Sequence, residues 1–336
     1  MTNDFYILAM GRSGTTLLQN MLNAHPNAVV PPESFFVLNL YTKYKDETNW
    51  EPQTIRQFID DLYTDRPFRL VWQVKRETVE ASFKNQKINS FAQACNRVKS
   101  SFQESFKSKK IYAIGDKNPL YSTFAERMLE INPNAKIIHM VRDPRGTANG
   151  HINTFNRKDA LMVGMIWTNY NECILKLKTQ FPEQYLLVKY EALIANPRAT
   201  IANICTFLNI ENDPEILEYR KATIAQYDTY STALKWKHEN LLKPIDTEIA
   251  EKWKTALTPR QIKYVEYTTH KTAAKLGYNF ERPPSNFLML CRLPFSRLKF
   301  WLLYCIVHLY FNFPFAIRKL ILAIRSFLGD KKYKKA

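Results

Sequence analysis

Glycine is scarce in this chain, at only 8 of 336 residues, which excludes a collagen-like repeat and a glycine-rich flexible chain. Hydrophobic residues at 46% and charged residues at 24% are typical of an ordered globular protein. The five cysteines are odd in number and share no metal-ligand spacing, so the sequence indicates neither a disulfide framework nor a zinc site. We therefore expect a reducing compartment and no metal.

Acidic residues are also few, since 31 Asp and Glu face 48 Lys and Arg and leave a net charge of +17. This excess predicts an anionic partner, which is a nucleic acid, a membrane surface or a phosphate-rich small molecule. The apolar run 5–10 begins too early and is too short for an export signal, so we expect no export from this amino terminus.

Short apolar runs alternate with stretches of helical periodicity, a pattern that predicts an α/β fold with a parallel sheet flanked by helices in three layers. One main domain is expected over residues 1–282, with a helical insertion at about 42–108 and a separate segment at 283–336. The predicted strands are 5–10, 28–30, 110–115, 136–141 and 185–190, and the predicted helices include 16–23, 123–131 and 196–208.

The first strand runs into a glycine turn and then a helix, an arrangement that aims backbone N–H groups and the positive end of a helix dipole at one anion. A nucleoside triphosphate loop would place Lys where Thr15 stands, whereas Arg12 offers a multidentate grip on a phosphosulfate. An ordinary strand-to-helix turn is the alternative. The loop consists of Gly11, Arg12, Ser13, Gly14, Thr15 and Thr16.

With this loop and an ordered series of further motifs, the sequence resembles the sulfotransferases that use 3'-phosphoadenosine 5'-phosphosulfate (PAPS), especially the branch of the protein-tyrosine sulfotransferases and many bacterial enzymes. The resemblance runs from about Asp4 to Phe280. It implies a P-loop-like fold and PAPS as the donor. The further motifs are Leu22-Asn23-Ala24-His25-Pro26, Glu33, Asp116-Lys117-Asn118-Pro119, Val141-Arg142-Asp143-Pro144-Arg145, Val188-Lys189-Tyr190-Glu191 and Leu276-Gly277-Tyr278.

The resemblance implies roles for several residues. The loop residues Arg12, Ser13, Gly14, Thr15 and Thr16 would bind the 5'-phosphosulfate, and Arg12 would also neutralise charge on the transferring group. Glu33 follows a short strand and matches the catalytic base, with His25 and His151 as rival bases and a solvated Glu as the alternative.

Two further residues match positions that contact the donor phosphates. Lys117 would stabilise the charge that develops on the leaving phosphate, unless it is a solvated surface lysine. Arg142 matches the arginine that holds the 3'-phosphate. The sequence departs from the family at Gly150, where a Ser is common, so only a backbone N–H can serve there or a neighbour such as Asn149 substitutes.

The nucleotide side of the site has two less specific candidates. Tyr190 matches a tyrosine near the adenine, although an aromatic residue on a strand is equally well explained as core. Lys243 is the best candidate in the irregular segment 226–243, which also holds Lys235, Lys237 and His238 and resembles a loop that closes over the nucleotide. A solvated charge run is its alternative.

The segment beyond residue 283 is apolar, aromatic and basic, with ten Lys or Arg after Ser285 and Asp330 as the one acidic residue. Its 18-residue uncharged run, 300–317, is short for a membrane span, and the flanking cations favour an interfacial helix on an anionic membrane surface. A span and a packed subdomain or oligomer interface stay as alternatives. The expected location is cytoplasmic, at the inner face of a membrane.

These observations predict an enzyme that transfers a sulfuryl group from PAPS to a hydroxyl acceptor, either carbohydrate, lipid or tyrosine. An ATP-dependent P-loop phosphotransferase is the enzymatic rival. A basic membrane- or nucleic-acid-binding protein with a relic nucleotide loop is the rival from another class, but no nucleic-acid partner is expected because no dense basic stripe is interleaved with aromatic residues. The sequence leaves the oligomeric state open.

Overall fold

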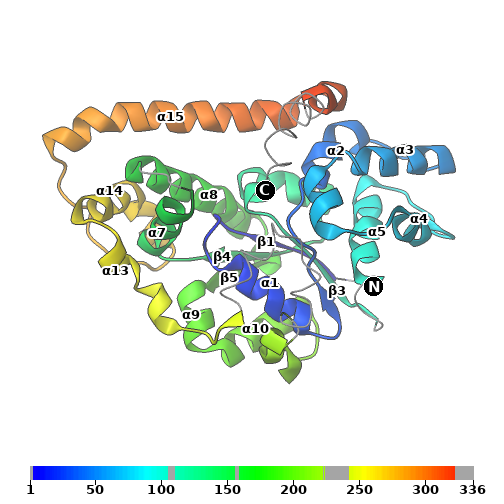
Figure 1. The fold of residues 1–336 in the computed structure, drawn as a ribbon, viewed down its shortest axis with the longest axis horizontal. Coiled ribbons are helices and arrows are strands. Elements are labelled where there is room, and N and C mark those ends of the chain that lie inside the picture. The colour runs from blue at the N-terminus through cyan, green and yellow to red at the C-terminus, as the bar shows by residue number, and fades with distance from the viewer. Residues whose placement is uncertain (1–2, 105–109, 156–158, 222, 224–241, 322–336) are drawn as a thin grey trace, which may run out of the picture. The chain divides into compact units, whose positions relative to one another are not determined.

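The computed structural model describes residues 3–104, 110–155, 159–221, 223 and 242–321 (Figure 1). The chain divides into two compact units. Unit 1 comprises Met1–Pro31 and Lys109–Leu302, and unit 2 comprises Pro32–Ser108 and Leu303–Ala336. The divisions therefore fall near residues 31, 108 and 302, whereas the sequence analysis placed boundaries near 42, 108 and 282.

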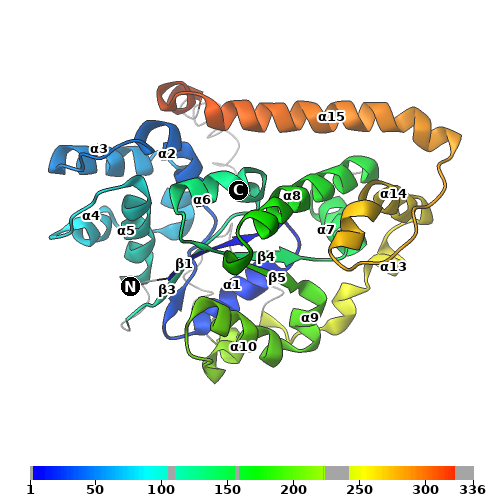
Figure 2. The same cartoon turned by 180° about the vertical axis from the view of Figure 1, so that it is seen from behind.

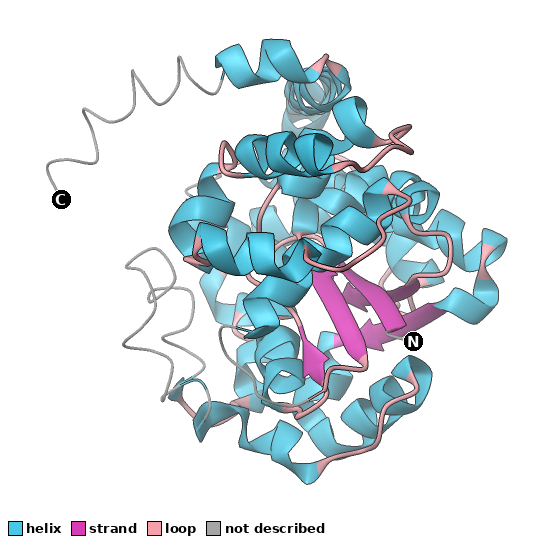
Figure 3. Ribbon diagram, turned by 90° about the vertical axis from the view of Figure 1, so that its right-hand side faces the viewer, coloured by secondary structure: helices cyan, strands magenta, loops and turns pink. Residues whose placement is uncertain are grey.

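Unit 1 contains a parallel sheet of five strands in the order β2-β3-β1-β4-β5, shown in magenta in Figure 3. This arrangement confirms the predicted α/β fold with a parallel sheet. The central strands are buried on both faces, which explains why most of their residues are apolar, although the strand Ala113–Lys117 also buries Asp116 and Lys117. The strands are β1 (Asn3–Leu8), β2 (Ala28–Val29), β3 (Ala113–Lys117), β4 (Lys136–Val141) and β5 (Tyr185–Lys189).

Helices cover both faces of this sheet, as Figures 1 and 2 show. One face packs on α1 (Thr15–Ala24), α9 (Tyr190–Ala195) and α10 (Pro197–Leu208), whose side chains share one buried apolar cluster with the strands. The other helices of unit 1 are η2 (Pro119–Phe124), α6 (Ala125–Ile131), α7 (Pro144–Phe155), α8 (Ala160–Gln180), η3 (Pro182–Gln184), η4 (Pro214–Glu218), η6 (Thr247–Ala250), α13 (Trp253–Ala256), α14 (Pro259–Lys275) and the start of α15 (Phe287–Asn312).

The strand register brings the exits of the strands to one edge of the sheet. Ile7 near the end of β1 pairs with Lys117 at the end of β3, and Val141 at the end of β4 pairs with Lys189 at the end of β5. In an open parallel sheet, ligands bind outside the carboxyl ends of the strands. The register therefore gathers the motif residues that follow β1, β3, β4 and β5 at the edge where a ligand is expected.

Capping residues in the sequence explain where two helices begin. One is η2, beside this edge, and the other is α10, on a face of the sheet. Asn118 accepts a hydrogen bond from the Leu120 amide at 3.0 Å, so it caps η2 just after Lys117 ends its strand. Asn196 caps α10 through the Ala199 amide at 3.2 Å, and a proline occupies the first helical position, where its missing N–H costs nothing.

Unit 2 is helical in its described residues and has an aromatic core. Phe58 lies at the centre of several edge-to-face ring contacts, including those with Tyr44 at 5.2 Å and Trp50 at 5.4 Å. The helices are α2 (Phe36–Tyr44), α3 (Pro52–Leu62), η1 (Phe68–Trp72), α4 (Arg76–Phe83), α5 (Phe91–Glu104) and the end of α15 with the following helix Phe315–Ile321.

The last described helix is tied into unit 2 by a buried arginine. Arg318 is 1% exposed and donates hydrogen bonds to the carbonyl oxygens of Leu38 and Phe313, at 3.0 and 3.1 Å, and to the Thr42 hydroxyl at 2.6 Å. Its neighbour Lys319 pairs with Asp61 on α3 at 3.3 Å. This part of the C-terminal segment is therefore integrated into the fold of unit 2.

Candidate active site

The loop between β1 and α1 has the conformation of an anion-binding turn. Arg12 and Gly14 both have positive φ angles, 71° and 87°, and Ser13 between them is buried. Gly14 is the N-cap residue of α1, and in the described structure no side chain caps the helix and no acidic residue lies in its first turn. The helix start thus directs unneutralised N–H groups toward the sheet edge, where they favour a phosphate or sulfate.

The ring of Tyr190 packs against this loop at Gly14. A Cβ added at Gly14 would lie 2.2 Å from Tyr190 Cδ2, so only glycine fits against the ring, and its φ of 87° also disfavours any other residue. The guanidinium of Arg142 lies over the same ring, 4.4 Å from its centroid. Burial raises the pKa of the Tyr190 phenol, which stays protonated. Tyr190 therefore connects the phosphate loop to the arginine predicted to bind the 3'-phosphate.

Arg142 follows β4 and is only partly satisfied by the protein. Its Nη2 donates to the Ile249 carbonyl at 2.7 Å, and its Nη1 lies 3.5 Å from the Arg12 carbonyl. Among the described residues, its buried Nε has no hydrogen-bond partner. A buried donor without a partner is costly unless a ligand or water completes it, so Arg142 is suited to an incoming anion.

Lys117 and His151 are two further candidates that the structure buries near the end of β1. Lys117 ends β3 beside β1 and is 2% exposed, so it is not the solvated surface lysine of the alternative interpretation. His151 on α7 lies with its Nε2 2.9 Å from the Gly11 carbonyl, which can only accept, so Nε2 carries the proton. This bond holds the ring against the loop and leaves Nδ1 as the unprotonated nitrogen.

Gly150 accommodates Arg12. A Cβ added at Gly150 would lie 2.8 Å from the Arg12 Cβ, an atom held close to the backbone, and 3.3 Å from the Arg12 Nε. A serine in this position would therefore collide with Arg12 as it is placed here. The departure from the family pattern and the left-handed conformation of Arg12 belong to one local arrangement.

A hydrogen-bond network joins three of the motifs, and the sequence analysis assigned it no role. Glu191 accepts from the Asp143 amide at 2.9 Å and from the Tyr278 hydroxyl at 2.7 Å. Burial, and then the Glu191 carboxylate, raise the pKa of Tyr278, which keeps its proton for this bond. Lys189 donates to the Gly277 carbonyl at 2.9 Å. The network fixes the backbone directly after Arg142.

Arg145 completes this support from α7. It forms a two-point interaction with Asp143, at 3.0 and 2.7 Å, and pairs with Glu266 on α14 at 3.0 Å. Its guanidinium also stacks 4.0 Å from the Trp253 ring centroid. Because all these groups are partnered, we assign Arg145 to positioning; the signal that could have identified it is its place in the same motif as Arg142.

The segment leading to Glu33 is held by α1. Gln19 donates to the carbonyl oxygens of Val30 and Pro31, at 3.0 and 2.8 Å, and Asn23 bonds both backbone groups of Val30. Glu33 follows as one of the first residues of unit 2 and is half-buried. His25, a rival base, is buried and uses both ring nitrogens, on the Glu211 carbonyl and the Asn27 amide, so its role is structural.

Of the irregular segment 226–243, the structure describes only residues 242 and 243. Lys243 is exposed, and the carbonyl of its neighbour Leu242 accepts from Arg220 at 3.1 Å. Lys235, Lys237 and His238 lie outside the described residues. Within the described ranges, no group of three or more His, Cys, Asp or Glu side chains could hold a metal ion.

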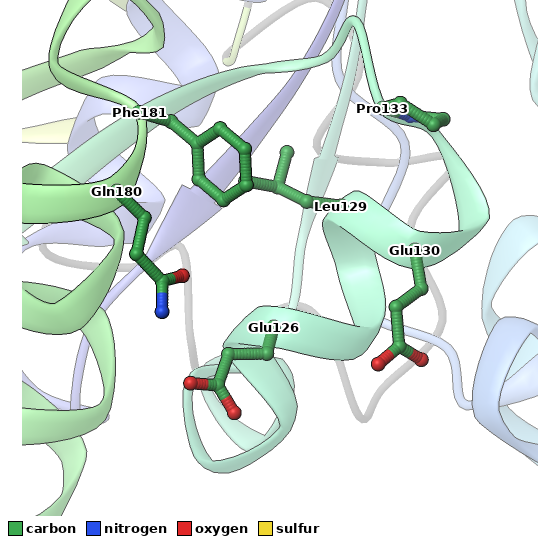
Figure 4. A pocket seen from close by; sticks show the side chains of 6 residues that line it. All are labelled: Glu126, Leu129, Glu130, Pro133, Gln180 and Phe181. Carbon is green, nitrogen blue, oxygen red and sulfur yellow. The ribbon is translucent and has the colours of Figure 1, made fainter.

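A separate pocket in unit 1 lies at the opposite edge of the sheet. Figure 4 shows Phe181 facing Leu129, with Glu126 and Glu130 on the same helix, α6. Pro133 precedes β4 and Phe181 precedes β5, so this pocket lies at the amino ends of the strands. It is therefore not part of the anion site at the carboxyl ends of the strands.

Comparison with known proteins identifies one family. Residues 4–214 match the model of the sulfotransferase family. Protein-tyrosine sulfotransferase A of Caenorhabditis elegans is 22% identical over 297 residues, which cover 84% of this chain and 69% of the relative. Carbohydrate sulfotransferase 1 of Mus musculus is 26% identical over 167 residues, which cover 43% and 39%. The solved sulfotransferase domain from the curacin biosynthetic pathway shares the fold, with a TM-score of 0.56 and 23% identity over 84% of this chain and 99% of that one.

Proposed function

Because the chain belongs to the sulfotransferase family, we propose that it transfers a sulfuryl group from PAPS to a hydroxyl acceptor. The observation that carries the donor assignment is the convergence in unit 1 of the uncapped start of α1, the buried Lys117 and the incompletely bonded Arg142. All three lie at or just after the ends of strands, at the carboxyl edge of the parallel sheet. Together they provide two cationic side chains and a set of backbone donors for a doubly phosphorylated nucleotide.

The two phosphate groups of the donor would occupy different parts of this edge. The backbone of the loop 11–16 and the exposed Arg12 would hold the 5'-phosphosulfate, while Arg142 would bind the 3'-phosphate that distinguishes PAPS from ADP. Gly150 offers only its backbone to that phosphate. Tyr190 packs against both the loop, at Gly14, and the guanidinium of Arg142. Lys243 is proposed to contribute from the irregular segment 226–243.

The reaction is an in-line displacement at sulfur. The acceptor oxygen forms a bond to sulfur while the bond between sulfur and the bridging oxygen of the phosphosulfate breaks, leaving 3'-phosphoadenosine 5'-phosphate (PAP). Lys117 and Arg12 would stabilise the negative charge that develops on the leaving phosphate and the transferring group. The acceptor proton would pass to the carboxylate of Glu33. The products are a sulfate ester, PAP and a protonated Glu33.

Membership of the family specifies the acceptor only as a compound with a hydroxyl group. Relatives are named for protein tyrosine and for carbohydrate, so a tyrosine side chain, a sugar or a lipid hydroxyl all fit this proposal. The residues discussed above serve the donor and the chemistry, and they do not select among these acceptors. The proposed membrane location rests on a different part of the chain, helix α15.

The donor proposal is tested by calorimetric titration of the purified protein with PAP, ADP, and ATP with Mg²⁺. We expect preferential binding of PAP, because only PAP carries the 3'-phosphate. Binding should be weaker in Arg12→Ala, because Arg12 would hold the 5'-phosphate. Tight binding of ATP without a preference for PAP would instead support a P-loop phosphotransferase.

The base is tested with labelled PAPS and a panel of tyrosine peptides, sugars and lipids. On the acceptor that reacts, Glu33→Gln should lower kcat by about 10²- to 10⁴-fold while PAP binding is unchanged. The matched control is Glu51→Gln, an exposed glutamate of the same unit, which should retain wild-type kcat. An unchanged kcat in Glu33→Gln would remove this residue from the mechanism.

A further inference from the structure

Helix α15 exposes a continuous apolar face. Phe287 is 83% exposed, Phe295 67%, Leu298 59% and Trp301 56%, and Ile306 further along is 63% exposed. On the other side of the same helix, a stripe of apolar residues that includes Met289 and Leu293 is buried. A helix on the surface of a soluble protein needs only the buried stripe, so the outer apolar residues require another explanation.

The protein holds this helix in place within unit 1. Ser296 donates to the carboxylate of Asp159, which lies 2.9 Å away and also caps α8 through the Met162 amide. Asn286 accepts from the Met289 amide at 2.9 Å and so caps α15 itself. The outer apolar side chains are therefore displayed by an anchored helix rather than by a frayed end.

The charges around this face are mainly positive, with Asp159 as a carboxylate 4.0 Å from Lys299. Arg292, Arg297 and Lys299 lie among the exposed apolar residues, and the sequence contains no Asp or Glu from 282 to 329. A second copy packed on the same face would bring its three cations against these three, and Asp159, which already contacts Ser296 and Lys299, would balance them poorly. A bilayer with anionic lipids provides both an apolar layer and negative charge, so it complements this face and a second copy does not.

The geometry favours a helix that lies on the bilayer. Among the described residues, no single helix is long and apolar enough to cross a membrane, although one bent pair, Phe287–Asn312 and Phe315–Ile321 at 118°, passes by length and composition. The second helix of that pair carries the buried Arg318, which is hydrogen-bonded to Leu38 and Thr42 in unit 2. Spanning would break those bonds inside hydrocarbon.

We propose that the outer face of α15 attaches the protein to an anionic membrane surface. Phe295, Leu298 and Trp301 insert at the boundary between headgroups and acyl chains, while the neighbouring cations contact lipid phosphates. Attachment through this face does not depend on sulfuryl transfer.

Flotation of the full-length protein with vesicles tests this attachment. We expect binding to phosphatidylcholine vesicles containing phosphatidylglycerol, and much weaker binding to phosphatidylcholine alone. Phe295→Ser/Trp301→Ser should lower the partition constant about 100-fold or more, since each aromatic side chain contributes substantially to burial. The control Phe181→Ser changes an exposed aromatic residue elsewhere in unit 1 and should float like the wild type.

Charge is tested separately with Arg292→Gln/Lys299→Gln, which should weaken binding to the anionic vesicles about 10- to 30-fold at low salt. The control Lys178→Gln/Lys271→Gln removes two exposed lysines from α8 and α14 and should have no such effect. Circular dichroism and thermal unfolding of every variant report whether it is folded. Quenching of Trp301 fluorescence by brominated lipid, absent in Trp301→Phe, would locate the residue directly.

Three outcomes would overturn the proposal. If the Phe295→Ser/Trp301→Ser variant floats like the wild type, the basic sequence at 331–335 carries the binding instead. If the wild type does not float but forms a dimer that this variant loses, the face is an interface between copies. If the membrane-bound protein resists extraction by high salt and alkali, α15 is part of a span.

Discussion

Arg142 in unit 1 and Arg318 in unit 2 are both drawn inward, but they differ in how completely the protein satisfies them. Arg318 is 1% exposed and donates through Nε, Nη1 and Nη2 to partners at 2.6 to 3.1 Å. Arg142 makes one short bond, to the Ile249 carbonyl, and its buried Nε has no partner among the described residues. The first arginine completes a fold, and the second leaves donors for a ligand.

The surroundings of the two arginines differ in the same way. Arg318 joins carbonyl oxygens and a hydroxyl within one helical unit, so its bonds stabilise packing. Arg142 lies over Tyr190, beside the loop that starts α1, and the Glu191 network fixes its backbone rather than its guanidinium. Positioning a side chain through its backbone while leaving its donors incomplete is how a binding group is prepared for its ligand.

The largest expected effect is on stability, in the variant Arg318→Met. Methionine keeps an apolar stem of similar length but removes the donors for Leu38, Phe313 and Thr42, so unfolding should become easier by about 3 kcal/mol. Urea unfolding measures this loss, and PAP binding below the unfolding transition should be unchanged. The neighbouring control is Lys319→Met, because the Lys319 side chain is half-exposed and the buried Asp61 keeps its shorter bonds to Lys43 and Tyr44, so the loss should be less than about 1 kcal/mol. Equal losses in both variants would contradict the structural role of Arg318.

His139 on β4 differs from both arginines because it is a basic side chain that is buried in its neutral form. Its Nε2 donates to Asn171 at 2.8 Å, and its Nδ1 accepts from the Tyr185 hydroxyl at 2.6 Å. Burial lowers the pKa of His139 to about 4, whereas the unfolded chain titrates near 6.5. The unfolded state therefore takes up the proton first as the pH falls.

The contribution of His139 to the free energy of unfolding should therefore be fully present above about pH 6.5. It should decrease by roughly 3 kcal/mol as the pH falls toward 4. Urea unfolding at pH 7.0, 5.5 and 4.5 measures the slope. His139→Gln should flatten it, although the variant starts from a lower stability at pH 7 because it loses its hydrogen bonds. A variant with the wild-type slope would show that His139 is not the titrating group.

Much of unit 1 could be predicted because its signals are local. The apolar run 136–141 is β4 without adjustment, and the Asn-Pro pair that follows Lys117 marks the end of β3. The phosphate loop was equally accessible, because a strand, a glycine turn and a helix start are adjacent in sequence. The strand expected at 110–115 instead pairs over Ala113–Lys117, because register depends on neighbours that a single segment does not reveal.

The interactions that could not be predicted join distant parts of the chain. Glu191 meets Tyr278 across 87 positions, and Arg318 meets Leu38 across 280. Motif order indicated that Arg142 and Tyr190 belong to one site, but not that the guanidinium lies over the ring. For the same reason, the charged residues after 317 read as surface cations in the sequence, while Arg318 is among the most buried side chains of the structure.

The variant Arg142→Met tests whether Arg142, unlike Arg318, serves a ligand rather than the fold. Methionine retains contact with the Tyr190 ring but removes the donors, so PAP affinity should fall about 10- to 100-fold while ADP affinity changes little. The thermal midpoint should stay close to that of the wild type. Arg220→Met is the matched control, because Arg220 also donates to a carbonyl of unit 1, that of Leu242, and is assigned no ligand. A large loss of stability in Arg142→Met with unchanged PAP affinity would place Arg142 with Arg318 as a structural residue.

The smallest expected effect concerns Gly150, beside Arg12. Because an added Cβ would lie 2.8 Å from the Arg12 Cβ, both Gly150→Ala and Gly150→Ser should displace the loop and weaken PAP binding by about fivefold. If the serine hydroxyl reaches the 3'-phosphate, Gly150→Ser will bind PAP more tightly than Gly150→Ala. The double variant Arg12→Gly/Gly150→Ser removes the colliding Cβ, so in a double-mutant cycle its thermal midpoint should exceed the additive value. Additive midpoints would mean that Gly150 and Arg12 are independent, and that the departure at Gly150 has a cause other than the position of Arg12.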